Sequence, residues 1–217
     1  MTKHLERDLD HLKRELLSLG ALVEDATNKA ITALVHRRAD LADEVRNGDD
    51  TIDAHELEIE EDCLKLLALH HPMATDLRFI VSVMKVNNDL ERMGDLAVNI
   101  ADRAFDMASA PPAVPPGDLL TMAERVRVMV RESLDSLVNR DCDLARKVVR
   151  DDEDVDAMHK RMFKLLEEQM MREPQSVALG IQTISASRHL ERIADLATNI
   201  AEDVVFMVDG EVIRHTR

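Results

Sequence analysis

The sequence contains no tryptophan and no tyrosine, and only four phenylalanines stand among its 217 residues. Aromatic side chains therefore make up 2% of the chain, whereas hydrophobic residues as a whole make up 45%. A core of this composition must be aliphatic, with the twelve methionines filling gaps between Leu, Ile, Val and Ala side chains. Glycine is also scarce, at six residues. This composition is typical of long helices and predicts an all-α protein.

Basic residues are outnumbered by acidic ones. Lys and Arg total 28 against 43 Asp and Glu, which leaves a formal net charge of −15. Such a surface repels nucleic-acid phosphates and anionic lipid headgroups, so we expect no nucleic acid partner. It favours metal cations or a basic protein partner instead.

Nothing in the sequence predicts secretion or membrane insertion. No run approaches the roughly 18 apolar residues that a membrane-spanning helix needs. The N-terminal stretch MTKHLERDLDHLKRELL is charged and periodic, without the apolar centre of a signal peptide. The two cysteines, Cys63 and Cys142, match no ligand or redox spacing and are expected to be free thiols. We therefore expect a cytoplasmic location.

One sequence motif, called the repeated phrase below, occurs twice, a hundred residues apart. Residues 90–101 read LERMGDLAVNIA, residues 190–201 read LERIADLATNIA, and nine of the twelve positions are identical. The repeat extends upstream, where residues 37–53 align with residues 140–156 at an offset of 103. Repeats at a fixed offset indicate two copies of one structural unit.

A proline-rich segment separates the two copies. Four of the six prolines stand together just before Gly117: Pro111, Pro112, Pro115 and Pro116. Because this segment cannot be helical, it predicts a first unit (1–110), a connector (111–117) and a second unit (118–217).

Apolar periodicity predicts three long helices in each unit, joined by short turns that make neighbouring helices antiparallel. The expected bounds are 3–36, 40–70 and 74–108 in the first unit and 118–139, 142–171 and 175–208 in the second. Asp40 and Asp143 are expected to be N-caps. The predicted fold is two three-helix bundles in tandem.

Pairs of carboxylates recur at i, i+4 spacing, which places both members on one face of a helix. The third helix of each unit carries one pair and the second helix carries another. The pairs are Asp49 with Asp53 and Glu91 with Asp95, then Asp152 with Asp156 and Glu191 with Asp195. The stripe on the second helix continues through Glu56 and Glu60 in the first unit and through His159 in the second.

Like charges at this spacing destabilise a helix slightly, so their repetition in both units indicates a compensating cation. An all-carboxylate donor set favours iron, manganese, magnesium or calcium over a tetrahedral zinc site. The alternative is that these stripes are ordinary solvated faces of an acidic protein. The sequence has no Glu-x-x-His of the ferritin-type di-iron oxidases, no P-loop and no nucleophile elbow, so no catalytic residues are expected.

The two phrases and the paired Glu/Asp-x-x-x-Asp motifs resemble the PhoU family of phosphate-transport regulatory proteins. The resemblance covers essentially the whole chain, including DLRFIVSVMKVNNDLERMGDLAVNIAD at 76–102. It implies a multinuclear iron or zinc cluster on a face of each bundle. The implied ligands are Asp49, Asp53, Glu91, Asp95, Asp152, Asp156, Glu191 and Asp195.

The resemblance also implies a cytoplasmic, non-enzymatic negative regulator of phosphate uptake and the phosphate regulon. Its expected partners are the ATPase subunit of the phosphate ABC transporter and a phosphate-sensing histidine kinase, and a homodimer is expected. Two departures put the equivalence of the bundles in doubt: Leu196 stands where the family often has His, and SVA at 176–178 replaces DLR at 76–78. The alternatives are a metal-dependent enzyme that uses the carboxylates and a purely structural dimerisation scaffold.

Overall fold

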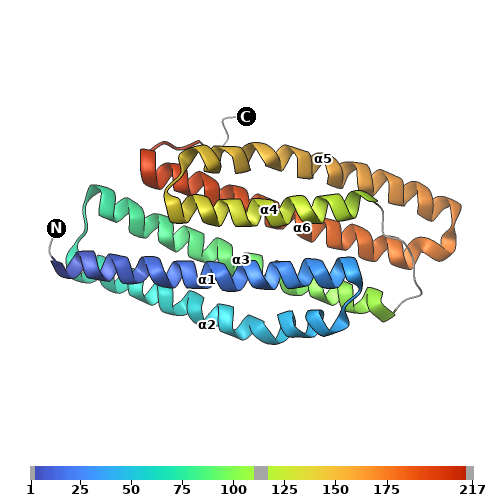
Figure 1. Ribbon diagram of the computed structural model, residues 1–217, viewed down its shortest axis with the longest axis horizontal. Coiled ribbons are helices and arrows are strands. Elements are labelled where there is room, and N and C mark those ends of the chain that lie inside the picture. Colours follow the sequence, from blue (N-terminus) through green and yellow to red (C-terminus); the bar gives the residue numbers. More distant parts are fainter. Residues whose placement is uncertain (1–2, 110–116, 214–217) are drawn as a thin grey trace.

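The computed structural model describes residues 3–109 and 117–213, and these residues form six long helices (Figure 1). The helices are α1 (Lys3–His36), α2 (Ala39–His70), α3 (Ala74–Ser109), α4 (Gly117–Asn139), α5 (Cys142–Arg172) and α6 (Val177–Asp209). The all-α prediction is confirmed, and every predicted helix bound lies within two residues of the observed one. The start of α6 differs because a short 3-10 turn, Pro174–Ser176, precedes it. Of the predicted connector, residues 111–116 lie outside the described residues.

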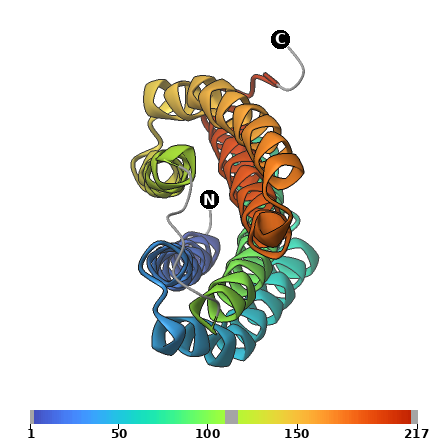
Figure 2. The same ribbon diagram turned by 90° about the vertical axis from the view of Figure 1, so that its right-hand side faces the viewer.

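Helices α1–α3 form one bundle and α4–α6 form the other, and the two lie against each other (Figure 2). The contacts between bundles run mainly from α3 to α6, with fewer from α1 to α4. The turns that lead into α2 and α5 have the same left-handed backbone at equivalent residues, with φ of 55° at Arg37 and 53° at Arg140. The repeat seen in the sequence is therefore also a repeat in the local backbone.

The prediction that Asp40 and Asp143 are N-caps is wrong. Arg38 is the N-cap of α2 and makes no side-chain cap bond; its Nε donates to Asp40 Oδ1 at 2.7 Å instead. In α5 the cap is Asp141, whose Oδ1 accepts from the backbone amides of Asp143 and Leu144 at 3.0 and 2.9 Å. Each cap lies two residues before the predicted one, because capping depends on backbone geometry before the first helical turn.

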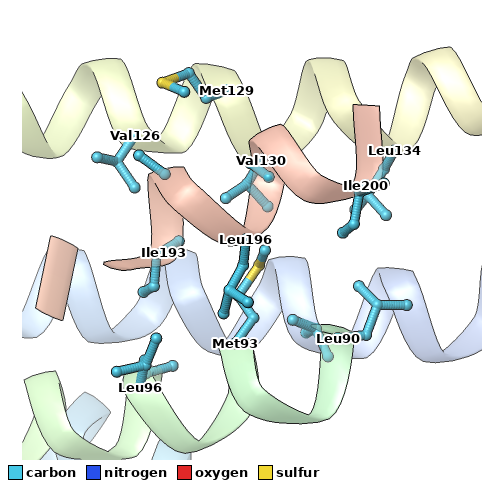
Figure 3. Close-up of a cluster of buried hydrophobic side chains, with 14 of the residues drawn as sticks. Leu90, Met93, Leu96, Val126, Met129, Val130, Leu134, Ile193, Leu196 and Ile200 are labelled. Carbon is cyan, nitrogen blue, oxygen red and sulfur yellow. The ribbon is translucent and has the colours of Figure 1, made fainter. Parts of the chain in front are cut away.

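The core is continuous across both bundles and is almost entirely aliphatic. Figure 3 shows its centre, where α3, α4 and α6 meet. The labelled side chains are Leu90, Met93, Leu96, Val126, Met129, Val130, Leu134, Ile193, Leu196 and Ile200. Both cysteines are free, as predicted, and burial raises the pKa of the Cys63 thiol to about 12. Across the described residues, no helix is both long and apolar enough to cross a membrane.

Helices α3 and α6 pack antiparallel, and two polar contacts fix their register. Lys85 Nζ lies 3.1 Å from Asp203 Oδ1, and Arg103 Nη1 donates to Gln182 Oε1 at 3.1 Å. The N-terminal half of α3 therefore packs against the C-terminal half of α6, and the C-terminal half of α3 packs against the N-terminal half of α6. On α3, the point midway between these two contacts falls near Met93. The two copies of the repeated phrase therefore cross at the centre of the molecule, related by an approximate two-fold axis.

Candidate functional site

The first carboxylate set lies beside a close approach of α2 and α3 at Gly94. A Cβ placed on Gly94 would lie 3.2 Å from two carbon atoms of Ile52 and 3.8 Å from Asp49 Oδ1. Glycine at this position therefore allows the close approach that brings the α2 carboxylates beside Asp95. In the second bundle the equivalent residues are Ala194 and Val155. The residue on the third helix is larger there, and the residue facing it on the second helix is smaller.

The electrostatics of the first bundle show that its predicted carboxylates form one set. Burial, followed by the charges of Asp53 and Asp95, raises the pKa of Asp49. Burial, followed by the charges of Asp95, Asp53 and Glu56, raises the pKa of Glu91, and the charge of Arg92 partly offsets the rise. Within the described residues, no Lys or Arg side chain forms a salt bridge with Asp49, Asp53 or Glu91. This set is a concentration of negative charge that a cation would relieve.

The second carboxylate set is assembled by α5 and α6 in the same way, but its surroundings differ. Asp152 is 4% exposed, whereas Asp156 is half-buried and lies 3.3 Å from Lys160 Nζ. A hydrogen-bond distance of 3.0 Å between His159 Nδ1 and Ser187 Oγ fixes the register of α5 against α6. In the first bundle the position of Lys160 is taken by Leu57. Asp156 therefore has a basic partner one turn away on its own helix, whereas its equivalent Asp53 has a leucine there.

The donor chemistry of both sets fits a hard cation, because oxygen atoms from two facing helices converge on one region. Across residues 3–109 and 117–213, however, no three His, Cys, Asp or Glu side chains are placed to hold one ion. Binding would therefore require carboxylates to rotate toward a common point. Rotation is available to the exposed side chains of Asp53, Asp95 and Asp195, but much less to the buried Asp152.

A groove of about 1020 Å³ runs between the bundles and joins the two carboxylate sets. It is lined by α3, α5 and α6. Asp95 enters it from the first set, and Asp152, Asp156 and Asp195 enter it from the second. The groove could not be predicted from the sequence, because it depends on how α3 crosses α6. The one available signal was the repeat itself, since two copies of a unit commonly pack about a two-fold axis.

The approximate two-fold axis repeats part of the groove lining, on α3 and α6 but not on α2 and α5. Arg92 and Asn99 line it from α3, and Arg192 and Asn199 line it from α6. The register of the two helices places Arg92 level with Asp195, and Arg192 level with Asp95. Each arginine thus lies at the level of a carboxylate of the other bundle, along the same groove.

A family model described as the PhoU domain matches residues 16–104 and 119–204, with one segment in each bundle. The chain belongs to the PhoU family. It is 38% identical to the phosphate-specific transport system accessory protein PhoU homolog of Aquifex aeolicus, over 97% of this chain and 96% of that protein. The corresponding homolog of Pseudomonas putida is also 38% identical, over 99% of this chain and 86% of its own length.

Solved structures show that the tandem-bundle architecture is shared. PhoU from Pseudomonas aeruginosa has a TM-score of 0.92 at 38% identity and covers 95% of this chain and 99% of that one. The phosphate transport system regulatory protein PhoU from Streptococcus pneumoniae has a TM-score of 0.88 at 31% identity, covering 96% and 99%. The family and the fold predicted from the sequence are confirmed. The domain bounds 1–110, 111–117 and 118–217 stay a prediction.

Proposed function

We propose that this protein is a regulatory accessory protein of a phosphate-specific transport system. It acts without catalysis, as a cytoplasmic negative regulator of phosphate uptake and of the phosphate regulon. The observation that supports this most is a family match in both bundles, together with 38% identity over nearly the whole chain to a relative named for that role. The ATPase subunit of the phosphate ABC transporter and a phosphate-sensing histidine kinase are the partners in this proposal.

The surface supports a function through protein contacts. Large apolar side chains are exposed at the two helix turns that lie at opposite ends of the molecule (Figure 1). Leu69 and Met73 are 75% and 80% exposed at the α2–α3 turn, and Met171 is 74% exposed near the α5–α6 turn. Exposed apolar groups on a strongly acidic surface suit docking onto a basic partner or onto a second copy of the chain.

The two carboxylate sets are the proposed metal centres. Asp49, Asp53, Glu91 and Asp95 would hold a metal cluster in the first bundle, and Asp152, Asp156, Glu191 and Asp195 would hold one in the second. Iron or zinc bound there would supply positive charge that offsets the repulsion within each set. The carboxylates would then tie α2 to α3, and α5 to α6, so that metal occupancy sets how rigid each bundle is.

The proposal is tested by deletion, complementation and co-purification. In phosphate-replete cells, deletion should derepress a phosphate-regulon reporter, and the wild-type chain should restore repression. A tagged chain should recover the transporter ATPase and the histidine kinase from the same cells. Glu153→Gln, an exposed acidic position outside the candidate sets, is the matched control. Recovery of neither partner, with the reporter indifferent to the deletion, would contradict the proposal.

The inter-bundle groove also supports a second candidate function, a metal-dependent enzyme, since it provides a substrate-sized space beside both carboxylate sets. Metal-loaded protein should then turn over a phosphoester or an oxidisable substrate, and Asp95→Asn should abolish the turnover. A complete absence of turnover across such substrates removes this candidate. The structural-scaffold alternative requires that Asp95→Asn/Asp195→Asn leave phosphate regulation intact.

A further inference from the structure

Two leucines lie on the side of α2 that faces away from the bundle. Within the described residues, α2 packs against α1 and α3 alone, through buried side chains that include Ile59 and Cys63. Leu57 and Leu64 lie outside this buried stripe and are 62% and 53% exposed. Seven residues, or two helical turns, separate them, so they share one face of the helix about 10 Å apart. No other part of the described chain covers this apolar pair.

Acidic residues surround the two leucines. Asp53, Glu60 and Glu61 lie within about 60° of Leu57 around the helix axis. They belong to a run, residues 49–62, that holds eight acidic side chains and no Lys or Arg: Asp49, Asp50, Asp53, Glu56, Glu58, Glu60, Glu61 and Asp62. Lys65 pairs with the last two of these, but within the described residues no Lys or Arg pairs with Asp53 or Glu60. The outer face of α2 is therefore an apolar pair inside a field of uncompensated negative charge.

The second bundle does not repeat this face. The residues equivalent to Leu57 and Leu64, at the offset of 103, are Lys160 and Glu167. The equivalent run, residues 152–165, holds four acidic residues and three basic ones, against eight and none in the first bundle. Because the same three-helix fold forms without the leucines and without the excess charge, packing within a bundle requires neither.

The chemistry of this face selects its occupant. Leucines two turns apart with acidic residues beside them match a helix that carries apolar residues at heptad spacing, flanked by Lys or Arg. The apolar side chains of such a helix would cover Leu57 and Leu64. Its basic side chains would reach Asp53, Glu60 and Glu61, which have the opposite charge. The α2 face of a second copy would not serve, because like charges would meet.

We propose that the outer face of α2 docks a basic amphipathic helix of a partner protein, with Leu57 and Leu64 as the apolar anchors. The proposal deepens the proposed function and rests on it, in that the protein must act through protein contacts. The acidic residues set the rate of encounter, and the leucines set the lifetime of the complex. The outer face of α5, which lacks both features, does not bind this helix.

The test uses a synthetic peptide of three heptads, with Leu at positions a and d and Lys at positions e and g. The lysines keep peptide copies apart while matching the acidic face. Binding to the full chain as purified is measured by fluorescence anisotropy and stopped flow. A control peptide with Glu in place of every Lys should bind at least about tenfold more weakly.

The apolar anchors are tested by Leu57→Lys/Leu64→Glu, which installs the residues of the second bundle and leaves the net charge unchanged. The variant should bind the basic peptide at least about tenfold more weakly, chiefly through faster dissociation. Circular dichroism should show that the fold persists. Leu165→Lys, which changes a 54% exposed leucine of α5, is the matched control and should bind as the wild type does. In NMR spectra, the peptide should shift the methyl resonances of Leu57 and Leu64 but not those of Leu165.

The charges are tested by Glu60→Gln/Glu61→Gln, which keeps both leucines. This variant should associate more slowly, and its association rate should fall less between about 50 mM and about 300 mM salt than that of the wild type. The dissociation rate should stay close to the wild-type value. Glu167→Gln/Glu168→Gln, two exposed acidic positions on α5, is the control and should leave both rates unchanged.

Three results would overturn the proposal. They are equal binding of the acidic and basic peptides, undiminished binding to Leu57→Lys/Leu64→Glu, and no binding of the basic peptide to the wild type. A wild-type dimer in sedimentation velocity that Leu57→Lys/Leu64→Glu separates would identify a second copy as the occupant and would also overturn it. Failure of the proposed function looks different: the phosphate reporter would ignore deletion of the chain, while the peptide would still bind α2.

Discussion

Lys85 of α3 and Asp203 of α6 form an ion pair across the boundary between the two bundles, with 3.1 Å between Nζ and Oδ1. The carboxylate side chain is 2% exposed, and the ammonium group also lies 5.1 Å from the centroid of the Phe206 ring. The approximate two-fold axis does not repeat this pair, since the equivalent residues are Ser185 and Arg103. The pair therefore marks one end of the α3–α6 contact as different from the other.

Lys85→Met should destabilise the protein by about 1–3 kcal/mol, because it removes a charged donor from a buried carboxylate. The lysine side chain is 40% exposed, so the cost stays below that of breaking a fully buried pair. Urea unfolding followed by circular dichroism measures the change. Lys164→Met, at an exposed position on α5, is the matched control and should stay within about 0.5 kcal/mol of the wild type.

Gly94→Ala should destabilise the first bundle by up to about 1–2 kcal/mol, because its Cβ would approach Ile52 to 3.2 Å and force the side chain to shift. Ile52→Val in the same chain should recover most of the loss, since Ala and Val are the pair that the second bundle uses at these positions. A double-mutant cycle gives the coupling energy. If the two changes add independently, this account of the helix approach is incorrect.

In metal-free buffer, the first carboxylate set should make the protein less stable as the pH rises. Asp49 and Glu91 have pKa values raised in the folded state, mainly by burial, so the folded state binds more protons than the unfolded state. Stability from these groups is present at low pH and is lost as the pH rises from their ordinary pKa through the raised folded values.

Asp49→Asn/Glu91→Gln should remove this pH dependence. The difference in unfolding free energy between wild type and variant, measured in chelator from pH 4 to pH 7, should move steadily in favour of the variant. Glu58→Gln, at an exposed acidic position on α2 whose charge raises neither pKa, is the control. A difference that is flat with pH would show that folding does not raise the pKa values of Asp49 and Glu91.

Untagged protein purified without chelator should contain several iron or zinc ions per chain, measured by plasma mass spectrometry. Asp95→Asn/Asp195→Asn should lose them, because it removes one ligand from each proposed centre, while Asp154→Asn should retain them. Wild-type protein that is helical and metal-free would instead make the carboxylate stripes an acidic docking face.

Local periodicity was enough to predict much of this protein from its sequence. Apolar residues at helical spacing gave six helices to within two residues, and the scarcity of aromatics gave an aliphatic core. Carboxylates at i, i+4 spacing predicted which side chains share a face, and in the first bundle the structure does bring Asp49, Asp53, Glu91 and Asp95 together. The helix bounds and the shared faces depend on residues within one or two turns, so the order of the chain determines them, whereas the meeting of α2 with α3 is a contact between helices.

What the sequence could not determine depends on contacts between distant segments. The N-caps were assigned wrongly at Asp40 and Asp143 because the turn geometry before each helix is set by packing. The groove exists because α3 crosses α6 antiparallel in the register fixed by Lys85 and Asp203. His159 contacts Ser187, which lies 28 residues away on another helix, so this contact also depends on helix packing. Periodicity assigns a residue to a face, but only the packing of helices determines which faces meet and in what register.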